Sequence, residues 1–240
     1  MTTPTNHSPE HHDPSRDSAW AAPVSKLKVG QVQGAINLNV EGRELVGPLQ
    51  GFGQLWQKTY WVRLAGASIT PQQVIASWKQ NFPKFWPAGN RFYGSLVGIQ
   101  PGGMPLSTGV MVLYSDDASF TLMTPQGHME SGWITFSAFE RDGATVAQVE
   151  SLARANDPMY ELGFMLFAHG TQEQFWLATL AALARHFGVN GQVQMRKMCI
   201  DSRWQWHQAR NIWHNAAMRT GMYVALTPLR WVGRLFKRRP

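Results

Sequence analysis

The spacing closest to a catalytic motif joins His128 and Glu130, which stand in the H-x-E arrangement of zinc deaminases. In that chemistry the histidine binds zinc and the glutamate moves a proton. The zinc also needs a Pro-Cys-x-x-Cys segment, and here Cys199 is the only cysteine. A site that also used Glu161 and His169 would depend on the fold to gather them, because their spacing gives no support. We therefore expect no metal site and no cofactor.

Other catalytic signatures are missing from the sequence. It has no nucleophile elbow, no P-loop and no dinucleotide-binding glycine fingerprint. His11 and His12 are adjacent, but they stand in a polar tail without the further ligands that define a metal geometry. A single cysteine excludes an intramolecular disulfide and suits a reducing compartment. We therefore expect binding without catalysis.

Polar or aromatic residues in or beside apolar strands are the candidates for contacting a ligand. They are Arg91, Tyr114, His128, Glu130, Trp133, Tyr160 and His169. His128 is the leading candidate for a general acid or base, because the ordinary pKa of histidine lies near neutral pH. The more common role of such residues, which we weigh against ligand contact, is to close a turn or to end a strand in solvent.

The positive charge of the chain is concentrated near its C-terminus. The formal net charge is +7, but residues 1–20 carry a net −2 and residues 21–190 are neutral. Residues 191–240 carry ten basic groups against Asp201 alone, a net +9. Any partner that binds the protein because of its positive charge would therefore contact the last fifth of the chain.

The last residues have the pattern of an amphipathic helix that lies on a membrane surface. At 100° per residue, the basic residues from 230 to 238 fall within an arc of about 100° and the apolar residues face the other way. The predicted membrane contacts are Arg230, Trp231, Arg234, Leu235, Phe236, Lys237 and Arg238. The five basic residues from Arg230 to Arg239, at about 1 kcal/mol each, would contribute roughly 5 kcal/mol at an anionic bilayer. Packing on the protein's own body is an equal alternative, and nucleic acid is a less favoured one.

Two helices have clear start and stop signals. Thr70, Pro71 and Gln73 form a capping box with proline in the first turn, and Pro83 ends that segment. The second helix is expected over residues 171–187, with Gly188 after its last turn. A third is expected from Ser202 to about Leu226, because its apolar residues are dense until Pro228.

The strands alternate with turns along the middle of the chain. They are expected over residues 57–64, 90–98, 109–114, 119–124, 132–140, 144–155 and 192–200. Tight hairpins are expected at residues 115–118 and 141–143, and Asp157 with Pro158 is expected to form a turn that ends the strand 144–155. On the strand 132–140, Phe136 and its neighbours at every second position share one face, while Trp133 and Thr135 share the other. Both faces carry apolar side chains, so we expect one of them to meet a helix and the other to line a cavity.

This order of elements predicts an α+β fold in which a curved antiparallel sheet closes around a long C-terminal helix. The helix start at residues 70–78, the hairpin strands within residues 132–154 and the helical run 175–184 resemble the START-like superfamily. That superfamily has the helix-grip fold, also called SRPBCC, of polyketide cyclases and lipid-transfer domains. The resemblance covers about residues 55–190, and it implies a cavity between sheet and long helix for a hydrophobic small molecule.

We therefore expect three regions. They are a disordered tail over residues 1–25, a START-like domain over residues 26–200 and a basic helical appendage over residues 201–240. The chain shows no secretory signal and no membrane-spanning apolar run, so we expect a cytoplasmic protein that associates peripherally with membranes.

The expected function is non-catalytic binding of a hydrophobic or lipid-like molecule between the sheet and the long helix. Eleven methionines and eleven tryptophans could contact such a ligand, or could simply fill a core. One alternative is a cyclase- or hydrolase-like enzyme that uses the same cavity with a histidine acid or base. Another is a protein that binds a protein or nucleic-acid partner through residues 202–240.

Overall fold

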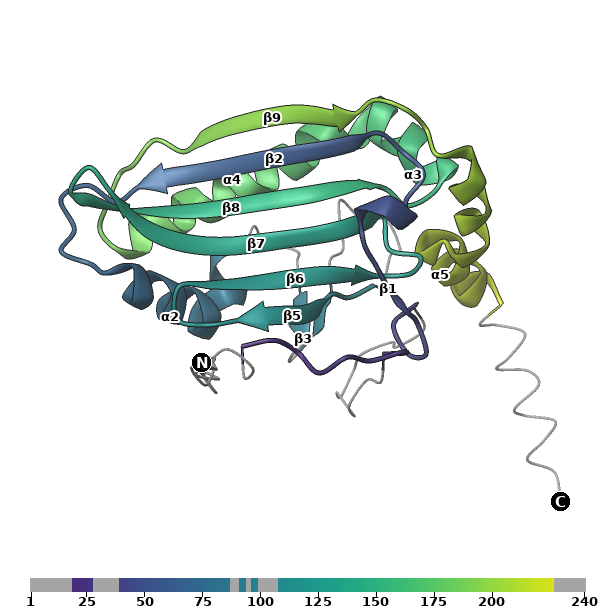
Figure 1. Ribbon diagram of the computed structural model, residues 1–240, viewed down its shortest axis with the longest axis horizontal. Coiled ribbons are helices and arrows are strands. Elements are labelled where there is room, and N and C mark those ends of the chain that lie inside the picture. Colours follow the sequence, from purple (N-terminus) through teal and green to yellow (C-terminus); the bar gives the residue numbers. More distant parts are fainter. Residues whose placement is uncertain (1–18, 28–38, 87–90, 94–95, 99–107, 227–240) are drawn as a thin grey trace, which may run out of the picture.

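A computed structural model describes residues 19–27, 39–86, 91–93, 96–98 and 108–226 (Figure 1). The main sheet contains β1 (Leu45–Val46), β2 (Leu55–Arg63), β5 (Met111–Ser115), β6 (Ser119–Pro125), β7 (Glu130–Arg141), β8 (Ala144–Ala155) and β9 (Gln194–Asp201). The α-helices are α2 (Pro71–Asn81), α3 (Pro158–Gly163), α4 (His169–His186) and α5 (Ala216–Ala225). Shorter helical segments are η2 (Pro48–Gln50), η3 (Phe82–Phe85), the π-helical turn η4 (Phe164–Ala168) and the 3-10 helix η5 (Trp206–His214).

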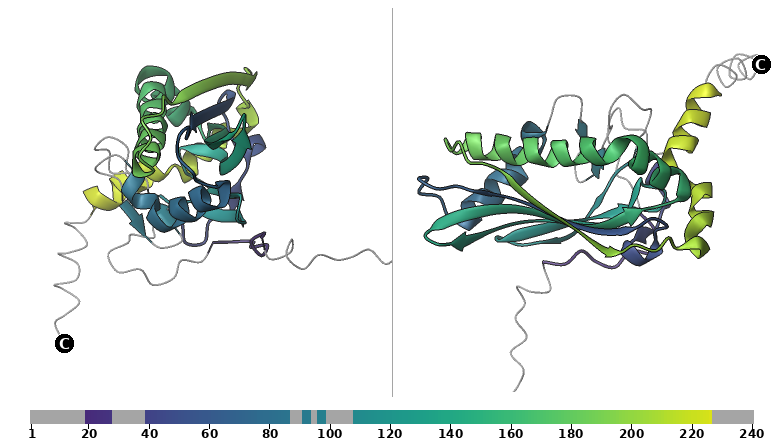
Figure 2. Two further views of the ribbon diagram at one scale, coloured as in Figure 1. Left: turned by 90° about the vertical axis from the view of Figure 1, so that its left-hand side faces the viewer. Right: turned by 90° about the horizontal axis from the view of Figure 1, so that it is seen from above.

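The sheet is antiparallel, with the strand order β1-β6-β7-β8-β2-β9, and β5 also pairs with β6. Helices α2 and α4 lie against one face of it, the inner face (Figures 1 and 2). Helices α3, η5 and α5 gather at one end of the sheet. The predicted α+β class with an antiparallel sheet is confirmed.

Local signals explain the most regular elements. Strands β7 and β8 pair over their full length, and their turn places Asp142 and Gly143 at φ values of 50° and 70°. Such positive φ values favour glycine and tolerate aspartate. At α2, the Thr70 hydroxyl accepts a hydrogen bond from the Gln73 amide, and the Gln73 side chain accepts one from the Thr70 amide. The predicted capping box is confirmed.

Aromatic side chains fill the space between the inner face and the helices. Phe136 is fully buried on β7, and its ring stacks on that of Phe120 with 4.6 Å between centroids. The rings of Trp78 from α2 and Trp176 from α4 meet Phe136 edge-on at 5.1 and 5.6 Å. The prediction that one face of this strand meets a helix is confirmed, and that face is the one that carries Phe136.

Three predicted elements differ in the structure. Residues 90–98, predicted as one strand, contain two short strands, β3 (Arg91–Tyr93) and β4 (Leu96–Gly98), which pair with each other. Asp157 and Pro158, predicted as a turn, begin α3, because the Asp157 carboxylate caps the amides of Met159 and Tyr160. Helix α4 starts at His169, two residues earlier than predicted.

The helix predicted over residues 202–226 is two helices. Asn215 separates η5 from α5, with a non-helical backbone (φ −50°, ψ 119°) and a side chain that accepts a hydrogen bond from the Met218 amide. Its own amide group donates to Asp157, 2.8 Å away. This side chain therefore begins a new helix where apolar periodicity alone predicts continuity.

Part of the tail predicted over residues 1–25 lies within the described residues. The carbonyl of Ala19 accepts from the amide of Ser115, and the amide of Ala21 donates to the carbonyl of Leu113. Residues 19–21 thus run beside β5. The predicted amphipathic helix with Arg230 to Arg238 lies outside the described residues.

Candidate functional site

A small polar recess lies between the inner face of β2, β7 and β8 and the start of α4. Lys58 Nζ donates to Gln172 Oε1 at 2.7 Å, and Gln172 Nε2 donates to Glu130 Oε2 at 2.8 Å. This chain of hydrogen bonds ties the sheet to the helix. The cavity beside it is about 10 Å³, which is room for about one water molecule.

Burial governs the electrostatics of the recess. Lys58 is only 4% exposed, and desolvation lowers the pKa of its amine while the nearby Glu130 carboxylate partly opposes that shift. At the next inner-face position, burial raises the pKa of the Tyr60 hydroxyl. That hydroxyl has no hydrogen-bond partner among the described residues. The site therefore favours neutral forms of its amine and its phenol.

The ligand cavity expected between sheet and long helix is not found among the described residues. The aromatic core occupies that space, and the recess is too small for a lipid-like molecule. Apolar side chains of the described residues pack against one another there, with four of the rings in edge or stacked contact with Phe136.

Two of the predicted site residues serve the scaffold. The ring of His128 is buried in the turn before β7, where Nδ1 accepts a hydrogen bond from the Glu130 amide at 3.0 Å. Burial lowers its pKa to about 4, so the ring is neutral at pH 7. Tyr160 lies beside α5, and its oxygen accepts from the Ala217 amide at 3.0 Å. Neither side chain is among the described residues that line the recess; Glu130 is.

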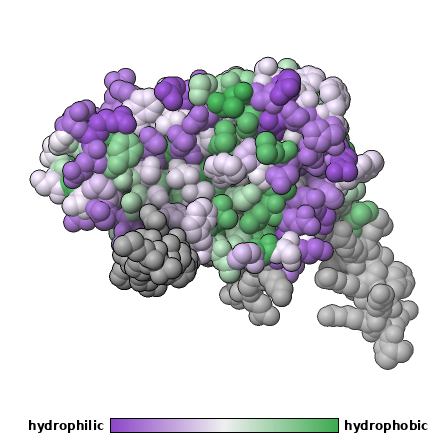
Figure 3. Space-filling view, viewed as in Figure 1, coloured by the Kyte–Doolittle hydropathy of each residue, from purple (hydrophilic) through white to green (hydrophobic). Residues whose placement is uncertain are grey.

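Two others lie on the opposite, outer face of the sheet. Tyr114 on β5 and Trp133 on β7 line a groove of about 650 Å³. The sequence pattern leaves open which face of this strand lines a cavity, and the structure shows that it is the Trp133 face. A band of hydrophobic residues crosses the same face (Figure 3). Arg91 lies in β3 and His169 begins α4, but their side chains are outside the described part of the chain.

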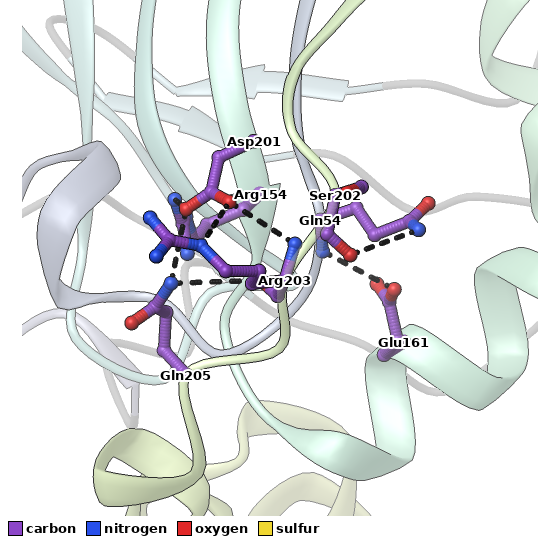
Figure 4. A network of polar contacts seen from close by, with 7 residues as sticks. All are labelled: Gln54, Arg154, Glu161, Asp201, Ser202, Arg203 and Gln205. Atoms are coloured by element: carbon purple, nitrogen blue, oxygen red, sulfur yellow. Dashed lines mark hydrogen bonds and ion pairs between the residues drawn. The ribbon is translucent and has the colours of Figure 1, made fainter.

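A polar network fastens the segment after β9 to the body (Figure 4). The Asp201 carboxylate lies 3.3 Å from Arg154 Nη2 and 3.0 Å from Arg203 Nε. Hydrogen bonds from Arg203 lower the pKa of Asp201 to about 2. Nearby, the Gln54 amide donates to Glu161 on α3, and the Gln54 side chain donates to the Ser202 carbonyl. The chain therefore leaves the sheet in a defined direction.

Further contacts hold the inner sides of η5 and α5. Asn211 Nδ2 donates to the carbonyls of Gln50 and Asn156, at 2.7 and 2.9 Å. The Ala216 amide donates to the Gly127 carbonyl at 2.9 Å. Gly127 has a φ of 88°, and a Cβ atom there would collide with the His214 carbonyl, so this position requires glycine. The C-terminal helices are thus docked onto the body.

The outer sides of these helices are apolar and cationic. A 3-10 helix repeats every three residues, so His207, Arg210 and Trp213 share one side of η5, and all three are exposed. Trp213 is 80% exposed and Trp206 is 68% exposed. From residue 202 onward the sequence contains no aspartate or glutamate.

The same end of the molecule gathers most of the exposed large apolar side chains. Of 18 such side chains among the described residues, 12 belong to a surface that we call the apolar end. Its members are Met159, Leu162, Met165, Leu166, Trp204, Trp206, Trp213, Met218, Met222, Tyr223, Val224 and Leu226. The sequence interpretation missed the contribution of α3 and η4, although an aspartate followed by proline is a helix-start signal.

Comparisons with known proteins find no matching family model and no matching curated protein. Solved structures with a similar course of the chain include a conserved protein from Geobacillus kaustophilus, with 9% identity and a TM-score of 0.39 over 57% of this chain and 99% of that one. DynU16, a putative protein of the dynemicin biosynthetic locus, has 12% identity and a TM-score of 0.35, over 57% of this chain.

The di-domain ARO/CYC protein StfQ of the steffimycin pathway has 11% identity and a TM-score of 0.36, over 56% of this chain. The chain spans about half the length of DynU16 and of StfQ, at 48% and 50%. At these scores the likeness carries no inference about family, ligand or reaction. The function must therefore be argued from the residues themselves.

No described helix is long and apolar enough to cross a bilayer. No group of three or more histidine, cysteine, aspartate or glutamate side chains is placed to hold a metal ion in the described part of the chain.

Proposed function

We propose that this protein is a non-catalytic binding protein of the cytoplasm that attaches to anionic membrane surfaces through its apolar end. The observation that carries the proposal is the gathering of 12 exposed large apolar side chains at one end, eight of them on the stretch after Asp201, which has no acidic residue. An exposed apolar patch of this kind indicates an interaction surface.

The chemistry of the apolar end fits a lipid surface. Tryptophan and tyrosine are favoured at the boundary between headgroups and acyl chains, and methionine and leucine side chains insert below it. Arg210 is exposed on η5 beside Trp213, and Arg219 lies on α5. Each cation near an anionic bilayer contributes about 1 kcal/mol. The five basic residues from Arg230 to Arg239 follow directly in the chain.

Two alternative roles of the C-terminal residues, packing on the protein's own body and binding of nucleic acid, are less well supported. Packing on the body accounts for the inner sides of η5 and α5, which are hydrogen-bonded to it, but leaves the outer sides uncovered by the described residues. Nucleic acid would use the cations and the tryptophans, but it has no need of Met218, Met222 and Leu226 along one side of α5. A membrane uses all three kinds of side chain.

The geometry favours binding over catalysis. The enzymatic alternative depends on His128, whose ring is buried, neutral and engaged with the Glu130 backbone. The recess that contains Glu130 and Lys58 has room for about one water molecule, so a substrate would have to displace packed side chains.

Sedimentation with lipid vesicles tests the attachment. Full-length protein should sediment with vesicles that contain phosphatidylserine, more weakly at high salt, and poorly with pure phosphatidylcholine. Deleting residues 228–240 should weaken the binding, and Trp206→Ala with Trp213→Ala should weaken it further.

The matched control is Phe139→Ala, which removes an aromatic ring from the outer face of β7 toward its Arg141 end. This variant should sediment like the parent protein. Equal binding to vesicles with and without phosphatidylserine would contradict attachment through the apolar end. Undiminished binding after deletion of residues 228–240 together with Trp206→Ala and Trp213→Ala would contradict it as well.

A further inference from the structure

The groove on the outer face is a ligand-sized site separate from the apolar end. Its described lining residues are Trp20, Leu113, Tyr114, Thr121, Trp133 and Thr135. Its volume of about 650 Å³ lies within the range of roughly 300–1,000 Å³ that is usual for small-molecule sites. In the sheet register, Tyr114 lies opposite Thr121, which lies opposite Thr135, so three strands form the floor.

The polar groups of this floor already have partners. The hydroxyls of Thr121 and Thr135 bond to each other at 2.9 Å, and the Tyr114 hydroxyl donates to the Asp116 carboxylate. A ligand in the groove would therefore contact mainly aromatic ring faces and methyl groups. The ring of Trp20 meets that of Tyr114 edge-on at 4.8 Å, and Trp133, 37% exposed, belongs to the next strand but one. Such a lining suits a flat apolar molecule.

Two carboxylate side chains, those of Glu150 and Asp116, lie near the edges of the groove. None of the six described lining residues is charged. Glu150 on β8 lies opposite Thr135 on the same face, half-buried, with its carboxylate accepting a hydrogen bond from Thr59. The Asp116 carboxylate is hydrogen-bonded to the Tyr114 hydroxyl.

None of the basic residues on neighbouring elements is among the described lining residues. Lys79 binds the backbone carbonyl of Asp116, and Arg154 on β8 is paired with Asp201. Arg196 on β9 is opposite Thr59, two strands from Glu150. Carboxylates at the edges and aromatic faces within favour a positive ligand, because ring faces attract cations.

We propose that this groove binds a planar organic cation, with its flat body between Trp133 and the Trp20–Tyr114 pair and its charge directed toward Glu150. This site goes beyond membrane attachment and uses a different face of the molecule. It also differs from the space between sheet and long helix where a ligand was first expected, which the core fills.

Dye binding to the full chain tests the proposal, with thioflavin T as a planar cation and anilinonaphthalene sulfonate as a planar anion. Thioflavin T should bind saturably, and Trp133→Ala should weaken it by about fivefold or more, the loss of a stacking and cation–π partner. Glu150→Gln should weaken thioflavin T and not the anion. Thr135→Lys, which places a positive charge on the floor, should abolish thioflavin T binding.

The control is again Phe139→Ala, which lies on the same face of the same strand, six residues from Trp133. It should leave thioflavin T binding unchanged, and thermal melts should confirm that every variant is folded. Thioflavin T affinity that is unchanged in both Trp133→Ala and Thr135→Lys overturns the site. Equal losses of both dyes in Glu150→Gln overturn its preference for cations. Because neither outcome involves lipid, failure here is distinct from failure of membrane attachment.

Discussion

Aromatic side chains gather in two regions of this protein, and the two differ in what surrounds them. Between the sheet and helices α2 and α4, Trp78, Phe120, Phe136 and Trp176 are all buried and touch one another. At the apolar end, the tryptophan side chains are exposed to solvent, although hydrogen bonds hold the segment that carries them against the body of the protein. The first arrangement stabilises the fold, whereas the second keeps apolar area available for a partner.

The largest effect separating the two regions should come from the buried aromatic cluster. Phe136→Ala removes a ring that contacts Trp78, Phe82, Phe120 and Trp176. We expect the free energy of unfolding to fall by about 3–5 kcal/mol, measured by urea denaturation. The folded variant should sediment with anionic vesicles like the parent. A loss below about 1 kcal/mol would mean that the cluster is not a packed core.

The next effect concerns pH and the turn that carries His128. Its pKa is about 4 in the folded protein and about 6.5 when unfolded, so between these values the unfolded chain binds the extra proton. Stability should therefore be lost as the pH falls from about 6.5 to about 4, by about 3 kcal/mol from this group.

The variant His128→Asn isolates that group, since its amide oxygen can still accept from the Glu130 amide. Denaturation at a series of pH values should show a shallower dependence in this variant than in the parent. Parallel curves would contradict a buried, neutral histidine.

A smaller effect should follow from loosening the docked backbone of the apolar end. Asn215 is fully buried, donates to Asp157 and caps α5. Asn215→Ala should cost about 1–3 kcal/mol, because it leaves the Asp157 carboxylate short of a partner and removes the cap. Hydrogen exchange should accelerate in α5 while the β7–β8 amides stay protected. Uniform acceleration across the whole protein would show that the end is not a separate unit.

The smallest effect on stability, with a clear effect on binding, should come from the exposed rings. Trp213→Ala should change the free energy of unfolding by about 0.5 kcal/mol or less, because the side chain is largely in solvent. Its affinity for phosphatidylserine vesicles should fall by about fivefold, which corresponds to about 1 kcal/mol. A large loss of stability with unchanged vesicle binding would reverse the roles assigned to the two regions.

The elements that the sequence predicts correctly are those specified by neighbouring residues. The capping box at Thr70 and the turn at Asp142 and Gly143 each depend on a few adjacent positions, and the alternation along β7 separates the Phe136 face from the Trp133 face. Where distant segments meet, prediction fails. The break at Asn215 depends on Asp157, and the packing of the inner face depends on rings from both helices and three strands.

The candidate site shows the same division. Glu130 enters the recess because Lys58 and Gln172 come to it from β2 and α4, which no local pattern reveals. The groove needs Trp20, from a segment predicted to be a disordered tail, to lie against Tyr114. Single residues such as Trp133 can be identified from strand alternation, whereas the partners that make them a site cannot.

Attachment through the apolar end can be measured most directly with a fluorophore whose emission reports local polarity. Cys199 is the only cysteine, so Cys199→Ser with Trp213→Cys places one label on η5, and Cys199→Ser with Glu140→Cys places one at the far end of β7. With phosphatidylserine vesicles, the label at position 213 should shift to the blue and the label at position 140 should not. A shift at position 140 alone, or at neither position while the protein sediments with the vesicles, would contradict attachment through the apolar end.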